Sequence, residues 1–110
     1  MTRKLYATAL SVACLFLHAP TLAQTVDGFA LAKSKTCLGC HQVEDKRVGP
    51  SFVQIARRHG NSQADVEYLA DSIMQGGRGR WGAIPMPAQS VTRQDALTLA
   101  RWITTLKPAD

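Results

Sequence analysis

No part of the sequence limits the possible folds more strongly than residues 36–43, which read TCLGCHQV. Two cysteines, Cys37 and Cys40, stand three positions apart, and His41 follows the second directly. A C-x-x-C pair by itself fits a redox-active dithiol, half of a zinc site or two buried thiols. The adjoining histidine and the rest of the chain decide between these alternatives.

Each alternative requires something different from the rest of the chain. A zinc site needs four ligands, usually from two such pairs, and the sequence offers no second pair. A thioredoxin-like dithiol needs a βαβ setting, and no segment shows sustained alternation of apolar and polar residues. C-x-x-C-H is the sequence form of c-type haem attachment, in which two thiols add across vinyl groups and the histidine reaches the iron. The motif CLGCH, in which Gly39 permits a tight turn, therefore predicts one covalently attached haem c.

The start of the chain resembles an export signal. Two basic residues precede an apolar run over residues 5–17, and Ala23 is a small residue suited to cleavage. The run is shorter than the roughly 20 apolar residues that a membrane-spanning helix needs. We therefore expect residues 1–23 to be a cleaved signal peptide that takes Cys14 with it, and residues 24–110 to be one periplasmic domain without a stable membrane anchor.

The size and charge of this domain limit its partners and its core. The 87 residues after Ala23 hold 11 basic and 8 acidic residues, so their net charge is +3. This small surplus suits weak docking to acidic partner proteins, and it argues against a nucleic-acid binder. So short a chain buries a small share of its surface, and its two cysteines exclude a disulfide framework. A covalently held haem would supply the missing apolar core.

Helical periodicity predicts an all-α fold with four short helices. They run over residues 26–35, from Pro50 and Ser51 to Gly60, from Ser62 to Gly76, and from Thr92 to Pro108. Ser62 and Thr92 each precede an aspartate by three positions, a spacing typical of helix starts. The apolar face of the first helix is expected at Val26, Phe29 and Ala30. Residues 76–91 are rich in Gly and Pro, which predicts an ordered loop.

The second axial position of the iron decides the chemistry, because a methionine closes the site and raises the potential. Met86 stands between Pro85 and Pro87, which stiffen the backbone and fix the place of one side chain. We interpret Met86 as the ligand and Met74, on the third helix, as core packing. His59 follows two arginines at a helix end, where it would complement the helix dipole.

Four motifs in order, CLGCH, RVGPSF, RWGAIPMP and LARWI, resemble those of the class I cytochromes c, of the small bacterial periplasmic monohaem type. The likeness covers residues 24–110. It implies a small all-α fold of about four short helices wrapped around one covalent haem. It also implies that the haem is attached to Cys37 and Cys40, and that its iron lies between His41 and Met86.

The resemblance assigns supporting roles as well. The carbonyl of Pro50 would accept a hydrogen bond from the ring nitrogen of His41 that does not face the iron. The indole of Trp81 would donate to a haem propionate. The first and last helices would cross at Phe29 or Leu31 and Trp102.

Two positions depart from the family pattern. Relatives often have an arginine, paired with a propionate, where Ser72 stands; Arg78 or Arg80 would substitute, or the propionate would be more solvated. Relatives also often have an asparagine that donates to the methionine sulfur where this chain has Gln89. The longer side chain would reach differently, and both departures leave the potential open.

Basic residues could form a docking face, although a merely solvated surface fits them equally. They are Lys33, Lys35, Lys46, Arg47, Arg57 and Arg58. A docking face of this kind would act by steering, so association would depend on salt.

The sequence thus predicts a soluble, monomeric electron carrier, not an enzyme. It would pass single electrons from a membrane cytochrome complex to a terminal reductase or oxidase. Two alternatives remain: a haem enzyme or gas sensor in which Met86 is labile, and a haem subunit of a larger respiratory complex.

Overall fold

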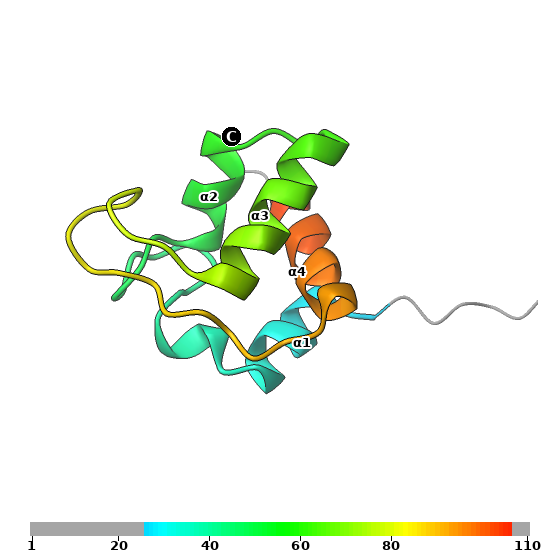
Figure 1. The fold of residues 1–110 in the computed structure, drawn as a ribbon, viewed down its shortest axis with the longest axis horizontal. Coiled ribbons are helices and arrows are strands. Elements are labelled where there is room, and N and C mark those ends of the chain that lie inside the picture. The colour runs from blue at the N-terminus through cyan, green and yellow to red at the C-terminus, as the bar shows by residue number, and fades with distance from the viewer. Residues whose placement is uncertain (1–25, 107–110) are drawn as a thin grey trace, which may run out of the picture.

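Four α-helices and one short 3-10 helix form the regular structure of residues 26–106, the part of the chain that this computed structural model describes. The predicted signal peptide lies outside these residues. The elements are α1 (Gly28–Ser34), η1 (Cys37–Gly39), α2 (Phe52–Arg58), α3 (Gln63–Gln75) and α4 (Arg93–Thr105). α4 contacts each of the other three α-helices, and the connection from α3 to α4 passes around one side of them (Figure 1). The predicted all-α fold is confirmed.

Side-chain caps set the starts of the helices where the sequence predicted them. Ser62 and Thr92 accept hydrogen bonds from the backbone N–H groups of Asp65 and Asp95, at 3.2 and 3.0 Å. Such caps satisfy donors that have no partner inside the helix. Ser51 caps α2 in the same way and forms a capping box with Gln54, a pair that was not predicted from the sequence. No helix within residues 26–106 is long and apolar enough to cross a membrane.

The core lies mainly between α3 and α4. Its buried apolar residues on these helices are Val66, Leu69, Ala70 and Ile73, then Ala96, Leu99, Ala100 and Ile103. Met74 packs against this core, as predicted. At the start of α4, Arg93 forms ion pairs with Glu67 and Asp71 of α3 and so links the two helices at the surface.

The predicted apolar face of α1 is wrong. Val26 precedes the helix and is 62% exposed, and the buried residues of α1 are Gly28 and Ala32. A Cβ atom at Gly28 would lie 2.1 Å from the Cβ atom of Trp102 on α4, so only small residues let the two helices approach this closely. Phe29 meets the indole of Trp102, with the ring centroids 6.2 Å apart.

Replacing Gly28 with alanine should therefore destabilise the protein. The new methyl group would force α1 and α4 apart, at a cost of about 2 kcal/mol, typical of overpacked sites. Chemical denaturation of the haem-loaded protein measures this loss. Lys33→Ala, on the exposed side of the same helix, serves as the control and should change stability little. Equal stability of Gly28→Ala and the wild type would show that α1 and α4 can separate at this crossing without measurable cost.

Candidate functional site

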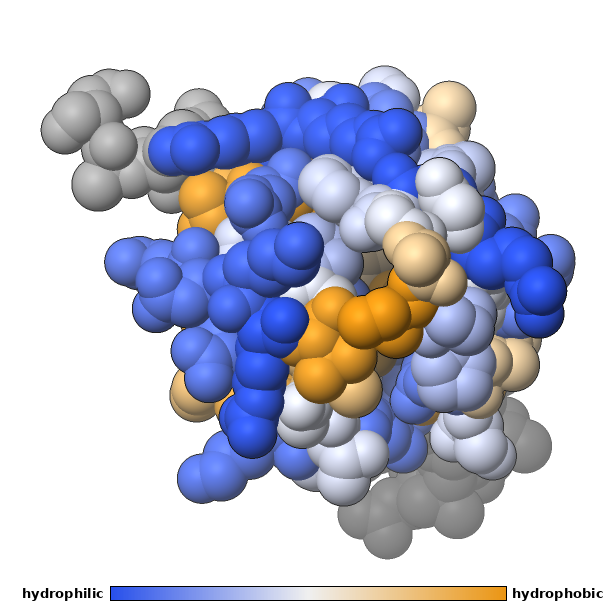
Figure 2. All heavy atoms as spheres, turned by 90° about the vertical axis from the view of Figure 1, so that its left-hand side faces the viewer, coloured by the Kyte–Doolittle hydropathy of each residue, from blue (hydrophilic) through white to orange (hydrophobic). Residues whose placement is uncertain are grey.

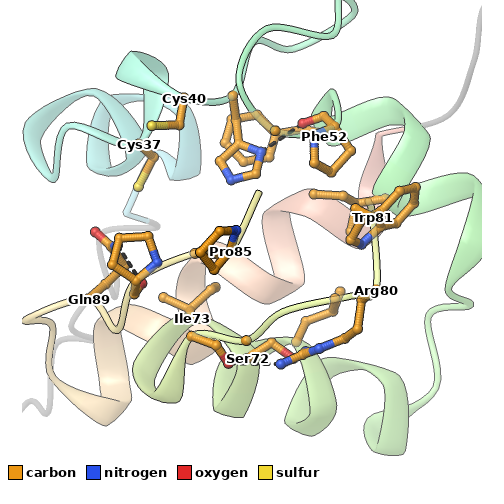
Figure 3. A pocket seen from close by; sticks show the side chains of 18 of the residues that line it. Cys37, Cys40, Phe52, Ser72, Ile73, Arg80, Trp81, Pro85 and Gln89 are labelled. Carbon is orange, nitrogen blue, oxygen red and sulfur yellow. Dashed lines mark hydrogen bonds between the residues drawn. The ribbon is translucent and has the colours of Figure 1, made fainter. Parts of the chain in front are cut away.

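Three of the five residues of the CLGCH motif line one pocket. η1 bends the chain so that the backbone N–H of His41 donates to the carbonyl of Cys37 at 2.9 Å. This turn places Cys37, Cys40 and His41 together in the lining of the pocket. Figure 3 shows both cysteines at one end of it. A short local turn therefore brings two thiols and one imidazole to the same cavity.

His41 is held rigidly in this lining. It is 9% exposed, and its Nδ1 lies 2.7 Å from the carbonyl oxygen of Pro50. Because a carbonyl only accepts, Nδ1 carries the proton and Nε2 keeps its lone pair for a metal. The ring also stacks on Phe52, with the centroids 5.3 Å apart. A Cβ atom at Gly49 would lie 2.6 Å from Cε1 of His41, so Gly49 leaves the room that the imidazole occupies.

Met86 lines the same pocket from the loop between α3 and α4. Its backbone pairs with Gly77 in an isolated antiparallel bridge, with N–H to O distances of 2.8 and 2.9 Å. Gly76, at a φ of 68°, begins this loop. The backbone of Gln89 donates to the carbonyl of Ile73 at 3.1 Å and ties the far end of the loop to α3. The predicted ordered loop thus has a hydrogen-bonded frame that fixes where Met86 stands.

Two further predicted residues lie at this pocket. Trp81 lines it, and the guanidinium of Arg58 stacks 4.5 Å from the centre of its ring. The side chain of Gln89 donates to the carbonyl of Pro87 at 2.8 Å, so its amide is occupied by the loop backbone. The cation–π contact of Arg58 could not be predicted from the sequence, since only the fold brings α2 beside the loop.

The sequence suggested that His59 complements a helix dipole. In the structure the residue has a further contact. It ends α2 and stacks on Tyr68 of α3, with the ring centroids 5.2 Å apart. Burial lowers the pKa of His59, and the neighbouring Arg58 lowers it further. The imidazole is therefore biased toward its neutral form, whereas a partner of the helix dipole would be charged.

The alternatives for the cysteine pair fit this site poorly. Burial raises the pKa of the Cys37 thiol, with a smaller contribution from Cys40, whereas redox-active dithiols depend on a lowered pKa. Among residues 26–106, no three His, Cys, Asp or Glu side chains come together as a metal site made of such ligands would require.

The residues do fit a haem c. The thiols of Cys37 and Cys40 and the imidazole of His41 come from one segment of the chain, and the thioether of Met86 comes from the α3–α4 loop. The rest of the lining is mainly apolar. Its buried aliphatic members are Ile55, Leu69, Ile73, Leu99 and Ile103. This apolar lining suits a flat porphyrin, and the imidazole and the thioether are available as ligands for its iron.

Comparisons with known proteins agree with this fit. The family model described as Cytochrome c matches residues 25–107. Cytochrome c-551 of Stutzerimonas stutzeri is 39% identical over 105 residues, which cover 96% of this chain and 99% of that protein. Cytochrome c-551 of Pseudomonas aeruginosa is 40% identical over 82 residues, covering 74% and 78%. The crystal structure of wild-type Nitrosomonas europaea cytochrome c552 superimposes with a TM-score of 0.70 at 46% identity, covering 72% of this chain and 99% of that one.

These relatives extend along most of the described chain, and the fold agrees with that of the solved structure. The chain therefore belongs to the cytochrome c family, as a small electron-transfer cytochrome of the c-551/c-552 type that carries one covalent haem c and is not an enzyme.

Proposed function

We propose that this protein is a periplasmic carrier that passes single electrons from a membrane cytochrome complex to a terminal reductase or oxidase, with its haem iron held by His41 and Met86. The proposal rests chiefly on the hydrogen-bonded ring of His41 and the hydrogen-bonded backbone of Met86, both of which lie in the lining of one pocket. When bound, the haem supplies a one-electron Fe(II)/Fe(III) couple. The polypeptide would supply the ligands of the iron and the surface that partner proteins contact.

His41 and Met86 would keep the site unchanged between the two oxidation states. The hydrogen bond from Nδ1 of His41 to Pro50 fixes the tautomer and raises the basicity of the other nitrogen. The thioether of Met86 favours the reduced state and raises the potential. Since both residues are anchored by backbone bonds, little would move when an electron arrives or leaves. Trp81, which lines the pocket, would donate to a propionate.

An apolar patch supports docking to redox partners. On the face that carries the α3–α4 loop, Figure 2 shows an apolar area surrounded by hydrophilic side chains. Ile84 is 65% exposed and Val48 is 45% exposed, and both lie at the rim of the pocket. An exposed apolar patch with a polar border is typical of protein interaction sites. We propose that partner proteins dock here and receive or deliver the electron at the nearby haem edge.

Two of the six basic residues predicted to form a docking face make contacts within the protein. Lys35 forms an ion pair with Asp95 at 3.0 Å. Arg58 donates to the carbonyl of Arg80 at 2.5 Å and stacks on Trp81. Of the six, Lys35 has its charge paired with a carboxylate within residues 26–106, whereas Arg58 keeps its charge, so any electrostatic steering falls to the other five. Their contribution would appear as an association rate that decreases with added salt.

An optical spectrum of the matured protein tests the proposal. It is recorded oxidised, reduced, and reduced under carbon monoxide. We expect low-spin spectra, the weak ferric methionine–iron band and no response to carbon monoxide, because Met86 would occupy the position that the gas needs. A high-spin spectrum that shifts under carbon monoxide would instead support the haem enzyme or gas sensor.

A further inference from the structure

The loop that carries Met86 has few attachments along its outer part, residues 78–85. This part lies between the two hydrogen bonds that pair the backbones of Gly77 and Met86. Its own backbone takes part in one hydrogen bond with the rest of residues 26–106, at the carbonyl oxygen of Arg80. A segment with so few backbone hydrogen bonds opens at a lower cost in free energy than a helix does. The contact at Arg80 is therefore important for keeping the loop in place.

That contact comes from Arg58, the last residue of α2. Its Nη1 donates to the carbonyl of Arg80 at 2.5 Å, and its guanidinium carbon lies 4.5 Å from the centre of the indole ring of Trp81. A planar guanidinium can stack on a ring and donate hydrogen bonds from its edge at the same time, whereas the ammonium group of a lysine cannot stack. One side chain thus holds two consecutive residues of the loop, which lie side by side at the pocket (Figure 3).

The side chain of Arg80 provides a different attachment, to α3. Its Nη1 donates to the Ser72 hydroxyl at 2.5 Å, and its Nη2 donates to the carbonyl of Gly76 at 2.8 Å. Both acceptors lie at the end of α3 from which the loop departs (Figure 1). These bonds alone would let the loop pivot about that end. Arg58 adds an attachment to a second helix, and two attachments to separate helices prevent such a pivot.

Two glycines flank the residues that Arg58 holds. Gly79 and Gly82 have φ angles of 76° and 117°, and a Cβ atom at either would meet nothing within 4 Å. Glycine adopts such angles without a steric cost, and these two positions are not packed against other segments. The backbone can therefore rotate on either side of Arg80 and Trp81. The place of the loop then depends on side-chain contacts more than on its own conformation.

We propose that Arg58 is a positioning residue that holds the α3–α4 loop against the pocket and so keeps Met86 on the iron. The effect at the iron rests on the proposed ligation by Met86, whereas the hold of Arg58 on the loop does not. Once Arg58 releases the Trp81 ring and the Arg80 carbonyl, the loop keeps only the bonds between Gly77 and Met86 and the attachment of Arg80 to α3. Open conformations then become more populated, and an external ligand can reach the iron.

Arg57 supplies a matched control on the same helix. It precedes Arg58, is exposed, and forms no ion pair within residues 26–106. Arg57→Gln and Arg58→Gln remove the same charge from neighbouring positions, so an effect of net charge alone would appear in both. Arg58→Lys keeps the charge but loses the planar stack on Trp81. Its effect should lie between those of the wild type and Arg58→Gln.

Hydrogen exchange of the reduced, haem-loaded protein measures how often the loop opens. The amides of Gly77 and Met86 report this opening, because each donates to the carbonyl of the other. We expect Arg58→Gln to speed their exchange by about tenfold, from the combined loss of a hydrogen bond and an exposed cation–π contact. Arg57→Gln should change it by about twofold at most. Gly28→Ala, which weakens the crossing of α1 and α4, should leave these two amides unaffected.

Imidazole binding to the oxidised protein provides the reading at the iron. Imidazole competes with Met86 for the same position, so its apparent affinity increases with the population of the open loop. We expect about tenfold tighter binding in Arg58→Gln and a change of about twofold at most in Arg57→Gln. An optical titration of the haem band measures both values.

Two results would overturn the proposal. One is equal exchange of the Gly77 and Met86 amides in Arg58→Gln and Arg57→Gln. The other is an acceleration in Gly28→Ala as large as in Arg58→Gln, since the loop would then open only when the whole domain unfolds. Absence of the ferric methionine–iron band from the wild type would refute the ligation and the effect at the iron. The exchange rates would still decide whether Arg58 holds the loop.

Discussion

Met86→Ala is expected to lower the reduction potential by a few tenths of a volt and to open the iron to carbon monoxide. Axial ligands shift haem potentials over a range of about 0.8 V, and methionine lies toward its upper part. Without the thioether, the loop framed by Gly77 and Met86 offers no comparable donor at that position. Redox titration measures the first effect, and the spectrum under carbon monoxide measures the second.

Met74→Ala is the matched control for this prediction. Met74 is the other methionine within residues 26–106, and it packs against the core. Its loss should cost roughly 2 kcal/mol or more of stability while the spectrum and potential stay close to the wild type. Retention of the ferric methionine–iron band in Met86→Ala, or its loss in Met74→Ala, would exchange the roles assigned to the two residues.

Gly76→Ala should destabilise the protein by about 3 kcal/mol and loosen Met86 at the same time. The residue has φ 68° and ψ −164°, a backbone region open almost only to glycine, where other residues cost about 1–3 kcal/mol. A Cβ atom there would also lie 2.4 Å from the carbonyl oxygen of Met86, which adds a steric penalty. The backbone cannot yield without moving the loop that presents Met86.

Gly79→Ala separates strain from contact. Gly79 also has a positive φ, of 76°, but a Cβ atom there meets nothing within 4 Å. It should cost only about 1 kcal/mol and leave the reduced protein as unresponsive to carbon monoxide as the wild type. Denaturation midpoints and carbon monoxide binding of both variants give the comparison. Similar costs for the two would mean that the close approach of Gly76 to Met86 has no energetic weight.

Local sequence signals predicted the helices well because their causes are local. Ser62 and Thr92 cap helices through bonds to residues three positions away, and Gly76 ends α3 through its own backbone conformation. The apolar stripe of α3 also repeats at a spacing that only a helix satisfies. The face of α1 could not be predicted in this way, because Gly28 is buried only by its approach to Trp102 on a helix far along the chain.

The haem-binding motif was equally plain, but the environment of the haem was not. The five consecutive residues CLGCH predict covalent attachment of a haem, and the position of Met86 between two prolines marks it as a candidate ligand. The neighbours Arg58, Tyr68 and Arg80 come from three separate elements, and nothing in their sequence spacing connects them. Exposed arginines and tyrosines are common on any surface, so only their arrangement around one cavity gives them meaning.

The family, the covalent haem and the all-α class could be predicted from the sequence, because each depends on residues adjacent in the chain or on a helical repeat. The tertiary structure alone decided that Phe29 meets Trp102, that Lys35 and Arg58 serve internal contacts, and that Arg80 rather than Arg78 is seated beside Ser72. These outcomes depend on distances between segments brought together by packing. Such distances are set by the shapes of all the intervening side chains, and a linear pattern does not contain them.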